Sequence, residues 1–502
     1  MTEALREIVA CFPVYRTYVG DDGQAAGERD RQHVEQAVAA AKRQSPTASP
    51  SVFDFIGDLL CRTGELDFVR RFQQLTGPVT AKGVEDTAFY RYNRLLSLNE
   101  VGGTPDRFGT PVPEFHRLNA ERLARWPHSL SATSTHDSKR SEDVRARINV
   151  LSELPHEWRA RLRTWHRLNR RHRTLVDGEP APDPNEEYFL YQTLVGAWPV
   201  EPVGDAEHAA FSERIERYMH KALREAKVHA SWVHPNPAYD AAVSRFIAAI
   251  LDRSEPPRPS PGRLRRLIGA IVAEPGVNPF LADFRPIQQR IAVAGTYNSL
   301  AQTLLKLVAP GVPDIYQGTE EWDLSLVDPD NRRPVDYARL RTDLRAIRER
   351  LAEPGADLAE LVRSLLATKE DGRIKLYLTH RVLDYRRQHA RLFQEGAYLP
   401  LEAQGPRREH VVAFGRQRES ETVVAVVPRF LARLHLTGPP VGSSVWGGTW
   451  LAIPEAWASR AYRNVLTGED VQVATREGRP GLALEAALAS FPVALLEATV
   501  EP

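Results

Sequence analysis

Residues 129–140 bring together side chains that suit a catalytic or binding site. A run of small and β-branched residues ends in His136 and Asp137, and Lys139 and Arg140 follow at once. An imidazole, a carboxylate and two cations are thereby gathered at one point of the chain. Most His-Asp pairs are surface or helix-capping residues, so the pair alone leaves a structural interpretation open.

The elements around this run predict how it is positioned. Residues up to Thr135 suit a strand enclosed on both faces. A helix should begin after Ser141, a good N-cap, because Glu142 and Asp143 complement the helix dipole and apolar residues then recur at helical spacing. Strand, polar tip and helix form a β/α unit, and in parallel α/β folds the carboxyl end of a strand is where catalytic residues lie.

Residues 72–92 form a second dense region. A strand around Val79 would leave Lys82, Glu85 and Asp86 on a glycine-containing loop, followed by aromatic residues such as Tyr90 that can lie against sugar rings. The alternative is a solvated ion-pair loop with core aromatic residues. The pattern alone does not separate the two.

The composition limits the class of partner. With 502 residues, Lys+Arg 66 and Asp+Glu 65, the net charge is +1, which argues against a polyanion such as nucleic acid and favours a neutral substrate such as a sugar polymer. The cysteines, Cys11 and Cys61, are too few for a disulfide framework, and no Cys/His cluster has zinc spacing. We expect no cofactor, no structural metal and no membrane segment, and a soluble, cytoplasmic protein.

The remaining pattern predicts helices, one more strand, and a β-rich end. Helices are expected over residues 2–12, 29–43, 156–175, 188–198, 211–228 and 286–308, with a linker at 180–184 and an arginine-rich run after Pro261. Residues 12–19 resemble a core strand, in which Tyr15 and Arg16 are more simply structural than sugar-binding. Residues 309–320 suit a strand with a polar exit. From Tyr398 onward, short β-rich runs separated by Gly/Pro turns predict an antiparallel sandwich.

Three motifs resemble one family. The run Thr-Ser-Thr-His-Asp-Ser-Lys-Arg-Ser-Glu-Asp is similar to the fourth signature region of the α-amylase superfamily, in the form found in maltooligosyltrehalose synthases. The run Ala-Lys-Gly-x-Glu-Asp-Thr-Ala-Phe-Tyr at 81–90 is highly characteristic of the same synthases. Residues 311–320 resemble the eighth strand of α-amylase-like barrels, and residues 326–337 resemble the continuation that those synthases carry. The resemblance extends from about Leu5 to the C-terminus.

The resemblance implies an α/β fold. The expected architecture is the C-terminal portion of an α-amylase-type (β/α)8 barrel with a helical insertion, followed by an antiparallel β-sandwich domain. The expected boundaries are 1–140 for later barrel strands and loops, 141–283 for the helical insertion, 284–390 for the final barrel strand and its helices, and 391–502 for the sandwich.

The resemblance also implies a reaction and its residues. The family converts the reducing-end α-1,4 bond of a maltooligosaccharide into an α,α-1,1 bond by intramolecular transglucosylation. Asp137 would be the third essential carboxylate and hold the sugar at the cleaved bond, and His136 would grip the same ring. Lys82 and Lys139 would anchor the glucose that turns over, and Tyr90 would be a stacking surface. No metal ligand is implied.

The expected nucleophile and acid/base are not found in the chain. Retaining glycosidases need both carboxylates, yet the runs Asp-x-Val-x-Asn-His and Gly-x-Arg-x-Asp and a Glu-bearing strand do not occur. We therefore expect this chain alone to be inactive and its partner to be the missing N-terminal barrel half. Two alternatives stay open: another α-glucan hydrolase or branching enzyme of the superfamily, and a non-catalytic glucan-binding or assembly fragment.

Overall fold

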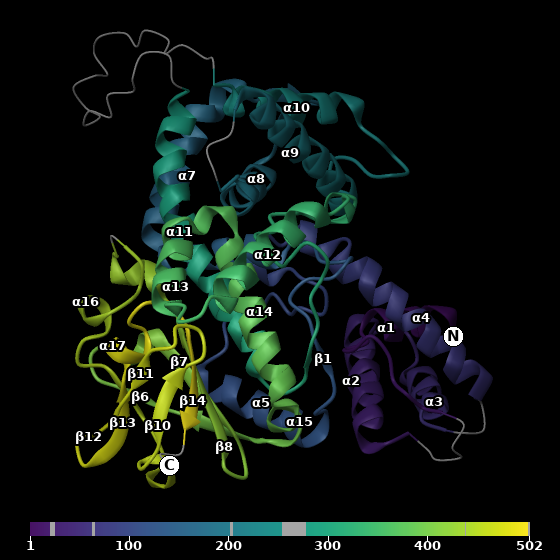
Figure 1. Cartoon of the computed structure of the whole chain (residues 1–502). Coiled ribbons are helices and arrows are strands. Elements are labelled where there is room, and N and C mark those ends of the chain that lie inside the picture. The colour runs from purple at the N-terminus through teal and green to yellow at the C-terminus, as the bar shows by residue number, and fades with distance from the viewer. Residues whose placement is uncertain (21–25, 63–65, 201–203, 254–277, 437, 500–502) are drawn as a thin grey trace. The chain divides into compact units, whose positions relative to one another are not determined.

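The computed structural model describes residues 1–499 apart from residues 21–25, 63–65, 201–203, 254–277 and 437 (Figure 1). These residues form two compact units, Met1–Arg94 with His220–Pro237, and Leu95–Met219 with Ala238–Pro502. The arginine-rich run after Pro261 lies outside the described residues. None of the described helices is long and apolar enough to cross a membrane.

The first unit is built from helices that share one apolar core. Its elements are α1 (Thr2–Ala10), α2 (Glu28–Gln44), α3 (Pro50–Leu60), α4 (Leu66–Thr80), the π-helical turn η1 (Ala81–Glu85) and the short helix η2 (Ala88–Tyr90). The helices at 2–12 and 29–43 are thus confirmed. Ile8, Val34, Phe53 and Phe72 are buried together, because each helix places its apolar residues on one face.

Two expected strands of this unit are absent. Within the described residues 12–19 the chain forms no strand. Instead, the side-chain amide of Gln73 satisfies both backbone groups of Val19, which donates to it at 2.9 Å and accepts from it at 3.2 Å. The strand expected around Val79 is the end of α4, which runs through Pro78. Lys82 therefore lies on a helical turn and not on a loop.

The second unit contains a short parallel pair of strands. Leu130 and Ser131 of β1 (Leu130–Ser131) lie opposite Val312 and Pro313 of β4 (Val312–Pro313). Backbone N–H groups of Val312 and Asp314 donate to the carbonyls of Ser129 and Ser131 at 2.9 and 3.0 Å. Gly311, with φ +116°, permits this approach, because an added Cβ would lie 2.8 Å from Ser131 Oγ.

Helices lie before, between and after these two strands in the second unit. They are α5 (Val112–Arg125), α6 (Glu142–Asn149), α7 (Pro155–Asn169), α8 (Pro184–Ala197), α9 (Asp205–Ala226, which continues into the first unit), α10 (Pro237–Leu251), α11 (Pro279–Val308), α12 (Tyr337–Ala352), α13 (Leu358–Ala367), α14 (Arg373–Gln388) and α15 (Ala390–Glu395). The short helices are η3 (Leu96–Leu98), η4 (Val150–Glu153), η5 (Arg170–His172), η7 (Asp330–Arg332) and η8 (Lys369–Asp371).

The helix expected over 156–175 ends early. It stops at Asn169, and a hairpin of β2 (Thr174–Val176) and β3 (Glu179–Ala181) follows. Asp177 and Gly178 both have positive φ, 52° and 86°, which is the backbone of the tightest hairpin turns. The linker expected at 180–184 is therefore one strand of this hairpin and the start of α8.

The β-rich end forms two antiparallel sheets. One has the order β11-β10-β14-β8-β7-β5 and the other β12-β13-β9-β6. Side chains of both sheets, among them Val424, Leu451 and Leu482, share one core. The strands are β5 (Ala397–Leu401), β6 (Ala403–Gln404), β7 (Val411–Arg418), β8 (Glu421–Pro428), β9 (Trp450–Ala452), β10 (Ala461–Asn464), β11 (Asp470–Val471), β12 (Val473–Arg476), β13 (Arg479–Ala483) and β14 (Ala494–Thr499); short helices between them are η9 (Arg408–His410), η10 (Leu431–Leu434), α16 (Ser443–Trp446), η11 (Glu455–Trp457) and α17 (Leu484–Ala487).

A helical layer covers the larger sheet. Leu304 of α11, Tyr377 of α14 and Val423 of β8 belong to one buried cluster, and Figure 1 shows α14 beside the strands of the β-rich part. Packing of apolar helix faces on a sheet explains why the long helix α11 is buried over so much of its length. Its predicted start at Pro286 is wrong, because α11 begins at Pro279 and Pro286 lies inside it.

Candidate functional site

Asp137 lies in a tight turn just after the carboxyl end of β1. The backbone N–H of Ser138 donates to the carbonyl of Thr135 at 3.2 Å, and Ser138 Oγ accepts from the Thr135 N–H at 2.8 Å. The N–H of Asp137 donates to Thr135 Oγ1 at 3.2 Å. Since these bonds use backbone and hydroxyl groups, the side chains of His136 and Asp137 remain exposed.

Two residues distant in sequence hold this turn. The carboxylate of Glu100 accepts hydrogen bonds from the backbone N–H groups of Lys139 at 2.7 Å and Arg140 at 3.1 Å. The amide of Asn331 donates to the carbonyl of His136 at 3.1 Å. A carboxylate that binds backbone N–H groups is a strong acceptor, so the turn is fixed on both sides of Asp137.

Arg140 is buried beneath the turn. It is 1% exposed, and its guanidinium donates to Tyr218 Oη at 2.9 Å and to the carbonyl of Leu96 at 3.3 Å. The ring of Phe189 lies 5.3 Å from the guanidinium carbon. Arg140 is therefore structural, which the sequence pattern did not distinguish from the exposed charges before it.

The start of α6 differs in detail from the expected cap. The helix begins at Glu142, as predicted, but the Glu142 N–H donates to Ser134 Oγ at 2.9 Å. Ser141 Oγ instead donates to Asp323 at 2.8 Å, and its backbone N–H donates to the carbonyl of Ser325. Ser141 remains the N-cap residue, but the side-chain acceptor for the first helical N–H is Ser134, which couples the segment before the turn to the helix.

Glu142 and Asp143 are buried ion-pair partners and not exposed dipole charges. Lys375 Nζ lies 2.7 Å from Glu142 and 2.9 Å from Asp143, with all three side chains at most 3% exposed. Lys306 is 3.5 Å from Glu142. Burial alone would raise the pKa of Glu142, but attraction by Lys375 and Lys306 outweighs it and lowers the pKa to about 2. The network ties α6 to α11 and α14.

Lys82 lies in the first unit on the π-helical turn η1. Its side chain is 78% exposed and pairs with Asp86. Its carbonyl accepts from Thr87 Oγ1 at 2.8 Å, and Lys227 Nζ donates to the same hydroxyl at 2.9 Å. The nearby Glu85 is buried and accepts a hydrogen bond from Tyr15. π-Helical turns recur at functional sites.

The remaining predicted residues are buried. Tyr90 is 6% exposed and Lys139 is 3% exposed, so only a small part of either side chain could contact a ligand at the surface. Lys82 and Tyr90 belong to the first unit, whereas His136, Asp137 and Lys139 belong to the second. Glu100, Ser134 and Asn331 were missed. The run Asp-Pro-Asp-Asn at 328–331 indicates a turn, but nothing local links it to Asp137.

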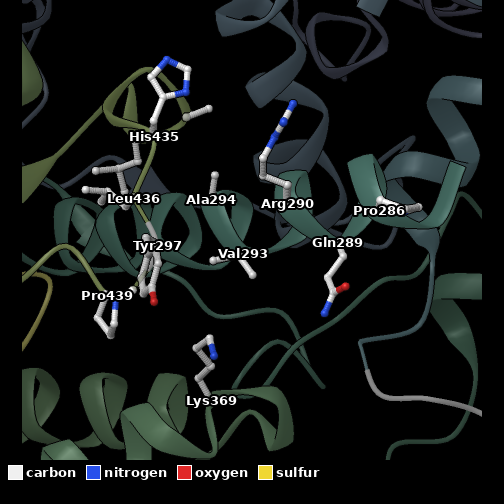
Figure 2. A pocket seen from close by; sticks show the side chains of 13 residues that line it. Pro286, Gln289, Arg290, Val293, Ala294, Tyr297, Lys369, His435, Leu436 and Pro439 are labelled. Carbon is white, nitrogen blue, oxygen red and sulfur yellow. The ribbon is translucent and has the colours of Figure 1, made fainter. Parts of the chain in front are cut away.

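A cavity of about 590 Å³ lies apart from all predicted site residues. It is bounded by α11 and by Lys369, Leu431, Ala432, His435, Leu436, Gly438 and Pro439. Figure 2 shows the side chains of Tyr297, Lys369 and Pro439 gathered on one side of it. Burial, followed by the charge of Glu370, raises the pKa of Tyr297 to about 12.

Comparisons of sequence and of structure both find maltooligosyltrehalose synthases among similar proteins. No protein-family model matches the chain. A curated relative from Mycobacterium tuberculosis, named "Putative maltooligosyl trehalose synthase", is 37% identical over 432 residues, which is 86% of this chain and 46% of the relative. The solved maltooligosyltrehalose synthase of Arthrobacter ramosus is 34% identical, with a TM-score of 0.75, over 99% of this chain and 54% of that one.

A second solved structure is similar to this chain over a comparable length. The hypothetical maltooligosyl trehalose synthase of Sulfolobus tokodaii is 28% identical, with a TM-score of 0.65, over 98% of this chain and 53% of that chain. The chain thus spans about half the length of the proteins it matches. In sequence and structure, the chain is similar to about half the length of these maltooligosyltrehalose synthases.

Proposed function

We propose that this chain is the part of a maltooligosyltrehalose synthase that binds the sugar at the cleaved bond. The reaction is an intramolecular transglucosylation in which the reducing-end α-1,4 bond of a maltooligosaccharide becomes an α,α-1,1 bond. In this reaction a glycosyl-enzyme forms, the released glucose turns over, and its anomeric hydroxyl attacks before water does.

The observation that carries the proposal is the exposed His136–Asp137 pair on a turn fixed by distant residues. A side chain on such a turn is held in place before a ligand arrives. Glu100 and Asn331 hold the backbone on either side of Asp137, and the carboxylate itself is left open to solvent. Identity of 34% to a solved synthase over 99% of this chain supports the reaction class.

We assign Asp137 the role of the third carboxylate. Its oxygens would accept hydrogen bonds from the 2- and 3-hydroxyls of the sugar and favour its oxocarbenium-like state. His136, the adjacent exposed side chain, would hold the same ring. In these roles Asp137 and His136 bind the sugar, and Asp137 itself breaks no bond.

Lys82 is proposed as the group that anchors the turning glucose. Its exposed ammonium can donate three hydrogen bonds, and the π-helical turn and the Thr87–Lys227 contact fix its backbone. Lys139 and Tyr90 are proposed as secondary contacts with the sugar, through the small part of each side chain that is exposed.

The nucleophile and the acid/base are proposed to come from additional polypeptide that completes an α-amylase-type barrel with β1 and β4. A two-residue parallel pair is not stable by itself and needs neighbouring strands. On this proposal the regions 1–140, 141–283, 284–390 and 391–502 are barrel portion, helical insertion, final barrel strand with its helices, and sandwich, and the enzyme works in the cytoplasm.

Incubation with maltopentaose tests the proposal. We expect residues 1–502 alone to yield no product, and a mixture with a polypeptide carrying the other half of a synthase to yield a non-reducing, trehalose-ended product. Steady product formation by residues 1–502 alone would contradict the proposal that the nucleophile and the acid/base come from additional polypeptide. Free glucose or shortened glucans without any trehalose-ended product would contradict the reaction class.

A further inference from the structure

A second cavity lies in the unit that contains Asp137, between α5 and the edge of the β-rich part. It encloses about 980 Å³ and is lined by residues of α5, β5, β6 and η9 and by Arg429 and Phe430. No residue of the Asp137 turn lines it, nor do Glu100 and Asn331, which hold that turn. Its size is that of a small-molecule or oligosaccharide site.

One side chain in the wall formed by α5 is a buried, hydrogen-bonded histidine. His116, 8% exposed, shares a hydrogen bond of 2.7 Å between its Nδ1 and Tyr398 Oη. Burial lowers the pKa of His116, which favours the neutral ring at pH 7. Much of the remaining lining is apolar: Val112, Pro113, Ala120, Pro400, Leu401, Ala403 and Val411.

The charged lining is balanced. Arg408 and Arg429 accompany Glu402 and Glu409 as charged lining residues, and the third arginine, Arg117, already pairs with Glu114 and Glu121 on its own helix. Among the residues that the structure describes, the side chains of Arg408 and Glu409 form no ion pair. The cavity therefore offers planar donors and acceptors without a net field that would select an anion or a cation.

One of these donors is held in place. The guanidinium carbon of Arg429 lies 3.8 Å from the ring centroid of Phe430. Stacking of this kind fixes the plane of the guanidinium group. Phe430 itself has φ 55°, an uncommon backbone for a bulky residue. Such conformations persist where the surroundings impose them, often at ligand sites.

We infer that this cavity is a second binding site for a neutral polyhydroxylated ligand, a segment of α-1,4-glucan. Guanidinium and carboxylate groups each offer two parallel contacts that match neighbouring hydroxyls, and an apolar floor suits the C–H face of a sugar ring. The choice of an α-glucan among such ligands rests on the proposed function. The site would hold a distant part of the chain whose reducing end is at Asp137.

Calorimetric titration of the full chain with maltoheptaose tests the inference. The Asp137→Asn background prevents turnover in any preparation. We expect Arg408→Ala to weaken binding about tenfold, the effect of losing hydrogen bonds from a charged group. The matched control is Arg407→Ala, an exposed neighbour that does not line the cavity, and it should change the affinity less than about twofold. Inorganic phosphate serves as the anionic probe.

Three results would overturn the inference: no maltoheptaose binding at millimolar concentration, equal affinity of the Arg408→Ala and Arg407→Ala variants, or binding of phosphate that Arg408→Ala abolishes without any effect on glucan. The titration does not depend on product formation. Glucan binding that requires Arg408, together with failure of the wild-type chain mixed with the other half of a synthase to form trehalose-ended product, would overturn the proposed reaction and leave this site standing.

Discussion

The side-chain amide of Asn331 donates a hydrogen bond to the main-chain carbonyl of His136 at 3.1 Å. The two residues are 195 positions apart in sequence. The same amide lies 3.4 Å from the carbonyl of Thr135. One side chain therefore fixes the backbone immediately before Asp137, and the position of the carboxylate depends on a segment that follows β4.

We predict that Asn331→Ala in the active assembly lowers kcat roughly ten- to hundredfold, because a loosened turn no longer holds Asp137 in the productive position. The free energy of unfolding should fall by only about 1 kcal/mol, the usual net value of a hydrogen bond. Steady-state kinetics and urea denaturation measure the two effects. Arg332→Ala, at an exposed neighbour, is the control; an equal loss of kcat in both variants would contradict the role of Asn331.

Lys375→Met should destabilise the fold strongly. It leaves Glu142 and Asp143 buried without their shared cation, and breaking a buried pair in this way costs about 3–5 kcal/mol. Arg350→Met removes a half-exposed partner of Glu353, 3.8 Å away, and should cost less than about 1 kcal/mol. Urea denaturation at pH 7 compares them. Similar midpoints for the two variants would show that the buried network contributes little.

The raised pKa of Glu153 predicts that the stability of the fold depends on pH. Burial raises its pKa from 4.5 to about 6, although the N–H of Ala432 donates to its carboxylate at 2.9 Å. The folded state then binds the proton more tightly than the unfolded state, so this group makes the protein less stable as pH rises from about 4.5 to 6. The full effect is at most about 2 kcal/mol.

Glu153→Gln removes this titration and can keep the hydrogen bond from Ala432. The difference in unfolding free energy between the variant and the wild type should grow in favour of the variant from pH 4.5 to pH 7. Urea denaturation across this range provides the measurement. A difference that is constant with pH would contradict the raised pKa.

Lys82→Ala should change the product ratio more than the rate. A glucose that is held less firmly escapes before its anomeric hydroxyl attacks, so free glucose should increase relative to trehalose-ended product. Chromatography of the products measures the ratio. Lys42→Ala, in the same unit but on α2, is the control, and an unchanged ratio for Lys82→Ala would remove this residue from the site.

The sequence predicted the features that are local. The His136–Asp137 turn, the helix that starts at Glu142 and the β-rich end all follow from neighbouring residues and their periodicity. The strand before the turn is shorter than expected, because β1 covers only Leu130 and Ser131, and Leu130 is exposed rather than enclosed. Glu100 and Asn331 could not be found in this way, because their contacts with the turn join segments far apart in sequence. The charges of Glu142 and Asp143 suited a helix N-terminus equally well, and only packing against Lys375 shows that they are buried.

The wrong predictions have a common physical reason. Residues 12–19 and the region around Val79 have apolar patterns short enough for either strand or helix. At Val19 a tertiary contact decides the outcome, because the amide of Gln73 occupies its backbone groups. Around Val79 the chain is instead the last turn of α4, which runs through Pro78 and whose described residues after Thr76 are not buried. Similarly, the helix expected over 156–175 stops at Asn169, and a hairpin with its turn at Asp177 and Gly178 follows.

Kinetics of Asp137→Asn in the active assembly test the central claim most directly. The variant keeps the shape of the side chain and removes its charge, and the wild-type turn is held by backbone and hydroxyl contacts that do not use the Asp137 carboxylate. We therefore expect unchanged thermal unfolding and a fall in kcat for trehalose-ended product of at least about a thousandfold, because the lost contacts strengthen in the transition state. Turnover within a few fold of wild type, in a variant with unaltered stability, would contradict the assignment of Asp137.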